Sequence, residues 1–343
     1  MYENYFKLDR KPFQLSPDPG FFFGSSIHKR ALAYLRYGLT QAEGFIAITG
    51  DVGTGKTTLA RMLFRELPPK EVIAAQIATT QLEADDLLRM VVQAFGLTVK
   101  SESKSALLEQ LEIFLHKQAR EGKRALLVVD EAQNLSHKAL EELRMLSNFQ
   151  TGDKPLLQSF LLGQNQFKRT LQHPDLEQLR QRFIAACHLT PLDEAETREY
   201  IEYRLVTAGW KNDPSITDEA FTDIFRHTKG IPRRINSLAD RLLLFAYLEE
   251  RHVIDPDAVS IVASELDEEL NITDDKKVID DEKMAITEEQ LGLSNHFGTR
   301  SQYNTPARFQ WDYLELRITA IESRLQILNS YIHRRFSEIK RKP

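Results

Sequence analysis

The sequence lacks three features that would place it in a specialised class. Its single cysteine, Cys187, allows no internal disulfide, and no Cys/His cluster has the spacing of a zinc site. Its formal net charge is −5, whereas a protein whose main task is to hold nucleic acid usually carries a basic excess. Apolar runs such as 242–248 are far shorter than the ~20 residues of a membrane-spanning helix, and the N-terminus has no apolar signal core. We therefore expect a cytoplasmic protein without a transmembrane segment, with Cys187 buried in a strand and any contact with the inner membrane made through partners.

Short apolar runs alternate with longer amphipathic segments in the first half of the chain. The runs stand at 45–49, 72–77, 125–130, 156–163 and 184–189, and helix-like segments lie between them near 57–66, 82–95, 104–120 and 136–148. Several of the runs are apolar at successive positions, which is typical of strands buried on both faces. This alternation predicts an α/β fold with a central parallel sheet flanked by helices.

The pattern changes after residue 192. Residues 193–265 read as helices only, with stops at Gly209, Gly230 and Pro256, and we interpret them as a separate all-helical lid domain (the lid). The stretch that follows is acidic and polar, as in a flexible linker. The last segment has a heptad seam, which predicts a coiled-coil-like helix that pairs with itself or a partner, or docks on the lid. The predicted divisions are an N-terminal segment at 1–44, the α/β domain at 45–192, the lid at 193–265, the linker at 266–308 and the C-terminal helix at 309–343.

The string GDVGTGKT at 50–57 matches a P-loop, and it stands between an expected strand and an expected helix. Glycines at three of its positions allow successive N–H groups to point at phosphate oxygens. Lys56 would reach the β- and γ-phosphates, and Thr57 would offer its hydroxyl to Mg²⁺. The predicted ATP-binding residues are Gly50, Asp51, Val52, Gly53, Thr54, Gly55, Lys56, Thr57 and Thr58.

A second string, ALLVVDEAQ at 125–133, supplies carboxylates at the end of an apolar strand. Ligands of open α/β sheets bind at the carboxyl ends of the strands, so Asp130 would hold Mg²⁺ and Glu131 would orient and polarise the attacking water. The two strings together predict a nucleotide hydrolase that uses ATP and Mg²⁺. A GTPase or a kinase is the alternative, but the guanine-reading NKxD motif of small GTPases is missing.

Arginines near the end of the α/β domain are candidate partners of the phosphates. Arg182 directly precedes the last strand and could project into a neighbouring subunit's site as an arginine finger, with Arg180 as the rival. Arg233, next to a helix-starting proline in the lid, could reach the γ-phosphate. Gln164 follows the fourth strand and could sense the γ-phosphate or the water.

The aromatic N-terminal segment offers walls for a base. Phe21–Phe23 and Ile27 could enclose adenine, or they could fill a gap between domains. The sequence leaves both interpretations open.

Several long strings together resemble a known family. They are GDVGTGKTTLARML, LLVVDEAQNLSHKALEELRMLSNFQ, LEQLRQRF, REYIEYRL with AGW, and GIPRRINSLADRLLLFAYLEE. They resemble the secretion-associated AAA+ ATPases of the GspA/ExeA type, most of all the branch found with exosortase and exopolysaccharide systems. Over residues 1–265 the resemblance implies an AAA+ P-loop fold and a homo-oligomeric ATPase that powers or regulates assembly of a bacterial envelope secretion or polysaccharide-export system. It places Lys56, Thr57, Asp130, Glu131, Gln164, Arg182 and Arg233 on the family's Walker A, Walker B, sensor, finger and lid positions.

Two departures from the family pattern matter. Larger members carry a membrane-spanning segment and a peptidoglycan-binding region, and neither is evident here, so we expect membrane delivery through a partner. Related sequences tend to read Gly-Gln-Pro after the fourth strand, whereas this chain reads Gly163-Gln164-Asn165. The turn after Gln164 is therefore left open.

Two other functions remain as alternatives. A DNA-associated AAA+ ATPase of the transposition-helper type would share the same core, but it normally adds a basic surface or a winged helix. The acidic linker and the absence of a strong nucleic-acid signal argue against it. A nucleotide-gated scaffold that oligomerises through the helix at 314–339, with slow turnover, is the other alternative.

Overall fold

The computed structural model of the chain describes residues 1–269, apart from 17, 42, 79–82 and 100–102. The described residues belong to one compact unit, Met1–Asp275. Most of the predicted linker and the whole predicted C-terminal helix lie outside the described residues. Within that described part, no helix combines the length and hydrophobicity needed to cross a bilayer.

A five-stranded parallel sheet forms the centre of the α/β domain, with the strand order β2-β3-β6-β1-β7. Its strands are β1 (Phe45–Gly50), β2 (Val72–Ala78), β3 (Arg124–Asp130), β6 (Leu157–Gly163) and β7 (Phe183–Leu189). β1 and β6 are buried at every position, as the continuous apolar runs predict. Cys187 is buried in β7, as expected.

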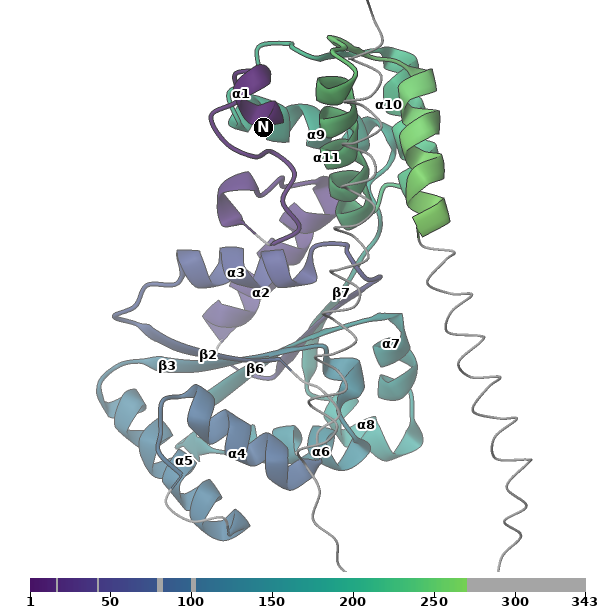
Figure 1. The fold of residues 1–343 in the computed structure, drawn as a ribbon. Helices are drawn as coiled ribbons and strands as arrows, with labels where there is room; N and C mark the ends of the chain where they lie inside the picture. Colours follow the sequence, from purple (N-terminus) through teal and green to yellow (C-terminus); the bar gives the residue numbers. More distant parts are fainter. Residues whose placement is uncertain (17, 42, 79–82, 100–102, 270–343) are drawn as a thin grey trace, which may run out of the picture. The chain divides into compact units, whose positions relative to one another are not determined.

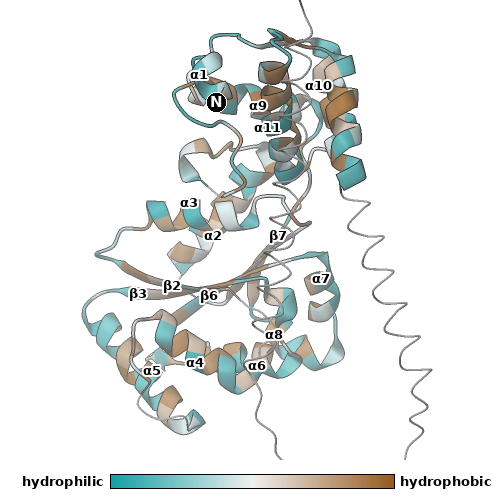
Figure 2. Cartoon of the chain, viewed as in Figure 1, coloured by the Kyte–Doolittle hydropathy of each residue, from teal (hydrophilic) through white to brown (hydrophobic). Residues whose placement is uncertain are grey.

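Helices cover both faces of the sheet (Figure 1). One face packs against α2 (Ser26–Gln41) and α3 (Lys56–Glu66), and the other against α4 (Ala84–Ala94), α5 (Lys104–Arg120) and α6 (His137–Leu146). Alternate residues of β3 serve the two cores, so Leu126 packs with α2 and α3 while Leu127 packs with α4, α5 and α6. In Figure 2 the apolar residues accordingly concentrate on the strands and on the helix faces turned toward them.

Short elements complete the α/β domain. They are a β4–β5 hairpin (Gln150–Thr151 and Lys154–Pro155), the single turns η2 (Ala132–Asn134) and η3 (Pro174–Leu176), and helices α7 (Asn165–Leu171) and α8 (Glu177–Arg180). The sheet order places β1 between β6 and β7, with Thr49 beside Gly163. The carboxyl ends of β1, β3 and β6 therefore meet at one edge, where the P-loop, Asp130 and Gln164 follow their strands.

The lid contains α9 (Glu194–Thr207), α10 (Asp218–Thr228), α11 (Pro232–Leu248) and a last helix over 256–269. The expectation of helices only is wrong in one detail, because β8 (Ser215–Ile216) and β9 (Val253–Ile254) form a two-stranded parallel pair. Strands of two residues leave no periodic signal in a sequence. Gly209 and Gly230 end helices in the left-handed region, as predicted.

Pro256 has the opposite role to the one predicted. It begins the last helix instead of stopping one, and the Asp255 carboxylate before it accepts a hydrogen bond from the Ala258 N–H at 2.9 Å. Proline suits the first helical position because its missing N–H would have no partner there. The helix continues to residue 269, past the predicted lid boundary at 265.

The N-terminal segment joins the lid to the α/β domain. It contains α1 (Tyr2–Tyr5) and the turn η1 (Pro19–Phe21) and leads into α2. Tyr2, Phe6, Leu8 and Phe13 are buried in the same core as α9 and α11. The chain therefore starts within the lid and crosses to the sheet, a long-range contact that the sequence did not predict.

Candidate nucleotide-binding site

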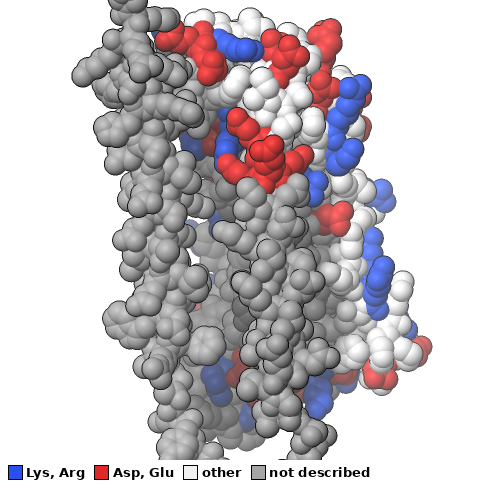
Figure 3. Space-filling model, turned by 45° about the vertical axis from the view of Figure 1, so that its right-hand side comes forward, with Lys and Arg blue, Asp and Glu red and all other residues white. Residues whose placement is uncertain are grey.

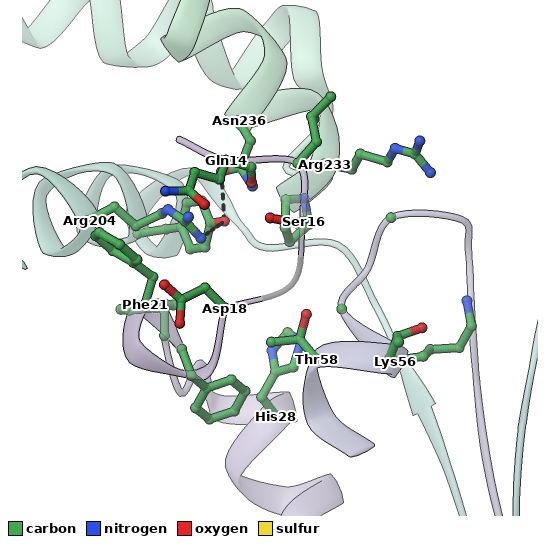
Figure 4. A pocket seen from close by; sticks show the side chains of 18 of the residues that line it. Gln14, Ser16, Asp18, Phe21, His28, Lys56, Thr58, Arg204, Arg233 and Asn236 are labelled. Atoms are coloured by element: carbon green, nitrogen blue, oxygen red, sulfur yellow. Dashed lines mark hydrogen bonds between the residues drawn. The ribbon is translucent and has the colours of Figure 1, made fainter. Parts of the chain in front are cut away.

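A cavity of about 280 Å³ opens between the P-loop, the lid and the N-terminal segment (Figure 4). Its phosphate-side lining is Val52, Gly53, Gly55, Lys56, Thr57, Thr58 and Glu131, and its lid-side lining is Leu192, Tyr200, Arg204, Pro232, Arg233 and Asn236. The N-terminal segment and α2 add Gln14, Leu15, Ser16, Asp18, Phe21, Phe22, Phe23 and His28. Three parts of the chain thus enclose one space.

The P-loop runs from β1 to the first turn of α3. Gly53 and Gly55 have φ values of +86° and +95°, which favour glycine, so motif and backbone agree. Lys56 is 6% exposed, and its ammonium donates to the carbonyls of Gly50 at 2.8 Å and Asp51 at 2.9 Å. Burial lowers the pKa of Lys56, while the carboxylates of Glu131, Asp130 and Asp51 oppose this effect.

The side chains predicted to hold Mg²⁺ lie next to each other. Thr57 Oγ1 donates to Asp130 Oδ2 at 2.8 Å, and Asp130 Oδ1 accepts the Glu131 N–H at 3.0 Å. A hydroxyl and a carboxylate at the phosphate end of the cavity are oxygen ligands of the kind that Mg²⁺ takes in nucleotide sites. The donor set therefore fits the ion.

Glu131 follows β3 with a left-handed backbone, at φ +55°. Its Oε2 accepts hydrogen bonds from Gln133 Nε2 at 2.5 Å and from Gln164 Nε2 at 3.0 Å. Burial raises the pKa of Glu131, but the bonds from Gln133 and Gln164 and the charge of Lys56 outweigh it, so the pKa lies below its ordinary value. The carboxylate is therefore ionised at neutral pH, as a group that polarises water requires.

Gln133 is a residue of the site that the sequence did not predict. Its Oε1 accepts the Gln164 N–H at 2.9 Å while its Nε2 donates to Glu131, so it ties the end of β3 to the end of β6. The open question about the next turn is also answered. Asn165, where related sequences tend to have proline, begins α7, and its amide donates to the Asp51 carboxylate in the P-loop.

The lid contacts the P-loop through the start of α11. The Arg233 N–H donates to the Gly53 carbonyl at 3.2 Å, and a Cβ on Gly53 would lie 2.6 Å from Arg233 Cβ. Only glycine at position 53 allows this approach. Arg233 lines the cavity at this contact (Figure 4), and its predicted reach to the γ-phosphate stays a prediction.

Comparisons with known proteins agree with this geometry. A family model described as an AAA domain matches residues 39–171. The chain therefore contains an AAA domain with a P-loop fold. The structures of ORC2 from Aeropyrum pernix and of CDC6P from Pyrobaculum aerophilum share its fold, with TM-scores of 0.58 and 0.57. Each is 17% identical; the first match covers 75% of this chain and 72% of that one, and the second covers 72% and 71%.

The chain is also similar to General secretion pathway protein A of Aeromonas hydrophila. The two are 39% identical over 267 residues, which is 78% of this chain and 48% of that protein. The chain thus spans about half the length of this relative. The similarity confirms the resemblance to the GspA/ExeA type, and it does not separate the exosortase and exopolysaccharide branch from the rest.

Neither of the two candidate finger arginines lines the cavity of its own chain. The Phe45 N–H donates to the Arg182 carbonyl at 2.9 Å, so Arg182 lies at the start of β1, whereas the P-loop follows the end of that strand. The strand spans about 20 Å at ~3.3 Å per residue. The Arg182 guanidinium donates to Ser147 and Asn148, and Arg180 donates to the carbonyls of Leu171 and His173, both at 2.9 Å. Arg182 is therefore remote from the P-loop of its own chain.

The end of the cavity away from the P-loop is aromatic and polar. Phe21, Phe22 and Phe23 line it, whereas Ile27 does not and packs against the α2–α3 core instead. The lid contributes Arg204, which is 6% exposed, and its guanidinium lies 4.9 Å from the centre of the Phe21 ring. Sequence reasoning missed Arg204, because a single arginine in a helix with many charged residues carries no signal of burial.

One group of possible metal ligands lies outside the cavity. His137, His173 and Asp175 bring ligand atoms within 4.8 Å of one another, and all three residues are exposed. His137 opens α6 and His173 caps η3, where the positive ends of the helix dipoles oppose a cation. We assign no function to this group.

Proposed function

We propose that this chain is an ATPase that couples ATP hydrolysis to the assembly or regulation of a bacterial envelope secretion system, or of an exopolysaccharide-export system. The observation that carries the proposal is one cavity in which Lys56, Thr57 and Glu131 face a lid contact at Arg233. The similarity to a general secretion pathway protein over 78% of the chain supports the secretion role. We further propose a homo-oligomer that meets the inner membrane through partner proteins.

The arrangement supports a separate role for each of these side chains during hydrolysis. The P-loop amides and Lys56 would bind the phosphates, and Thr57 with Asp130 would hold Mg²⁺, which spreads the charge that develops on the transferred phosphoryl group. Glu131 would orient and polarise the attacking water, positioned by Gln133 and Gln164. Arg233 would report the phosphate state to the lid, because its own backbone N–H already contacts the P-loop.

The DNA-associated alternative receives little support from the described surface. On the visible part of the face in Figure 3, lysine and arginine side chains are interspersed with aspartate and glutamate, as in a surface without a single dominant charge. Phosphate-backbone binding needs clustered cations and weakens steeply with salt.

Capture from the native host tests the proposed role. A Glu131→Gln protein saturated with ATP is used as bait on the detergent-solubilised envelope fraction, with Lys56→Ala as the matched control. We expect secretion or polysaccharide-export proteins to be enriched on the first bait and not on the second. Equal recovery on both baits, or salt-dependent recovery of duplex DNA instead of envelope proteins, would contradict the proposal.

A further inference from the structure

A P-loop binds phosphate only while its N–H groups point inward, which requires its carbonyls to point outward and to find donors there. In this chain four such carbonyls have partners. Lys56 donates to the carbonyls of Gly50 and Asp51, and the Arg233 N–H donates to that of Gly53. The fourth, the Thr54 carbonyl, pairs with His28 Nε2 at 2.9 Å. Lys56 and Arg233 are expected to move when phosphates bind and the lid responds. His28 belongs to α2, and so to neither the loop nor the lid.

His28 lies in the first turn of α2 and is 5% exposed. The Thr54 carbonyl can only accept, so Nε2 carries the proton and donates it. Nδ1 lies 2.6 Å from Ser25 Oγ and, in the neutral ring, accepts from that hydroxyl. Burial lowers the pKa of His28, and the Thr54 bond and Glu196 oppose this only in part, so the ring is neutral at pH 7.

The position of the imidazole is fixed from several sides. A Cβ on Gly55 would lie 3.0 Å from His28 Nε2, so the ring packs directly under the loop. The Phe22 ring meets it edge-on at 6.0 Å. The Ser26 N–H, at the start of α2, donates to Glu196 Oε1 of the lid at 2.9 Å. The start of α2, which carries His28, is therefore hydrogen-bonded both to the P-loop and to α9.

We propose that His28 is a positioning residue for phosphate binding: its Nε2–H holds the Thr54 carbonyl outward and so keeps the P-loop amides directed at the nucleotide. The inference rests on the P-loop being the ATP site. His28 donates to the Thr54 carbonyl, so it acts on the loop through Thr54. Because the loop cradles the α- and β-phosphates, loss of that hydrogen bond weakens ATP and ADP by the same factor.

Three substitutions separate a hydrogen-bonding role from a packing role. His28→Gln places an amide N–H near the position of Nε2, His28→Asn has a shorter amide that does not reach Thr54, and His28→Leu keeps apolar bulk without a donor. Binding of fluorescent ATP and ADP to the full chain is measured for each. We expect His28→Gln to stay within about threefold of wild type, and the other two to weaken both nucleotides by about tenfold, the worth of one buried hydrogen bond.

The order of the variants decides the question. Affinity in His28→Leu equal to or above that of His28→Gln would overturn the proposal, because packing alone would then explain the residue. If His28→Leu does not fold, the comparison of His28→Gln with His28→Asn carries the test, and equal affinities would overturn it. The exposed His227→Leu serves as a matched control and should bind like wild type. Lys56→Ala checks the site itself: if it still binds ATP, the P-loop assignment fails, independently of His28.

Discussion

At the scale of single residues, the site depends on side chains that hold the reactive ones. Glu131 adopts a left-handed backbone that is uncommon for a residue with a side chain, and two glutamines from different loops bond its carboxylate. Such an arrangement persists only where the surroundings fix it. The carboxylate is thereby directed to the phosphate end of the cavity instead of to solvent.

Glu131→Gln should separate ATP binding from hydrolysis. The amide keeps the shape of the side chain but polarises water poorly, so we expect turnover to fall by roughly 10²–10⁴-fold while ATP remains bound. Steady-state phosphate release, together with the nucleotide content of the isolated protein, measures both effects. Wild-type turnover would show that Glu131 is structural and that the catalytic carboxylate lies elsewhere.

His28 predicts how stability changes with pH. The pKa of His28 in the folded protein is lowered from the ordinary value of 6.5. The neutral ring therefore contributes fully to the free energy of unfolding above pH 6.5, and this contribution is lost as the pH falls below that value. Wild type should therefore lose more Tm between about pH 7.5 and about pH 5.5 than His28→Gln does, since glutamine does not titrate. Calorimetry at both pH values checks this, and parallel losses in the two proteins would contradict it.

At the scale of elements, the sequence predicted the strands and motifs that a local residue pattern encodes. Continuous apolar runs identified all five sheet strands, and the P-loop and Asp-Glu strings located the residues that the fold brings to one edge. Contacts between residues far apart in the sequence could not be predicted in this way. Gln133 and His28 pair with residues on other elements, and no spacing rule connects them. The β8–β9 pair was not predicted for another reason: its strands are too short to show a periodic pattern in the sequence.

The N-terminal segment is the element that the sequence described least well. Phe13 is buried in the lid core, and the Arg204 guanidinium donates to the Pro12 carbonyl at 2.7 Å. Asn236 Nδ2 of α11 donates to the Gln14 carbonyl at 3.3 Å. The segment thus forms a wall of the cavity because the lid holds it on both sides of Phe13.

Phe13→Ala should destabilise the folded unit through this element. Phe13 is 2% exposed, and its loss leaves a cavity in the lid core that costs about 3–5 kcal/mol, a fall in Tm of roughly 10 °C. Leu15, two positions along the same segment, is 63% exposed, so Leu15→Ala should leave Tm nearly unchanged. Thermal melts of both variants test the packing. Similar Tm values for the two would mean that the segment does not pack on the lid.

At the scale of the whole molecule, the site looks incomplete for hydrolysis within one subunit. Arg182 lies at the opposite end of β1 from the P-loop, bonded to Ser147 and Asn148. An arginine finger in addition to Arg233 of the lid would then have to come from a second copy of the chain. A closed, symmetric assembly would supply one such arginine to every site.

Arg182→Ala should therefore impair neighbouring subunits. Loss of an arginine finger costs about 10³-fold or more in turnover, so mixing the variant with wild type should lower activity below the additive line. Turnover is measured against the mixing ratio, with Arg180→Ala as the comparison. An additive curve with a fully active Arg182→Ala protein would transfer the role to Arg180 or show that the enzyme works as a monomer.

The most direct test of ATP binding and hydrolysis at the P-loop is titration of the full chain with ATP·Mg, compared for wild type and Lys56→Ala, with turnover recorded on the same samples. In the described part of the chain, Lys56 is the only lysine that lines the cavity. We expect the substitution to abolish ATP binding and turnover, because the β- and γ-phosphates lose the ammonium directed at them. Unchanged affinity together with unchanged turnover would contradict the assignment of this site.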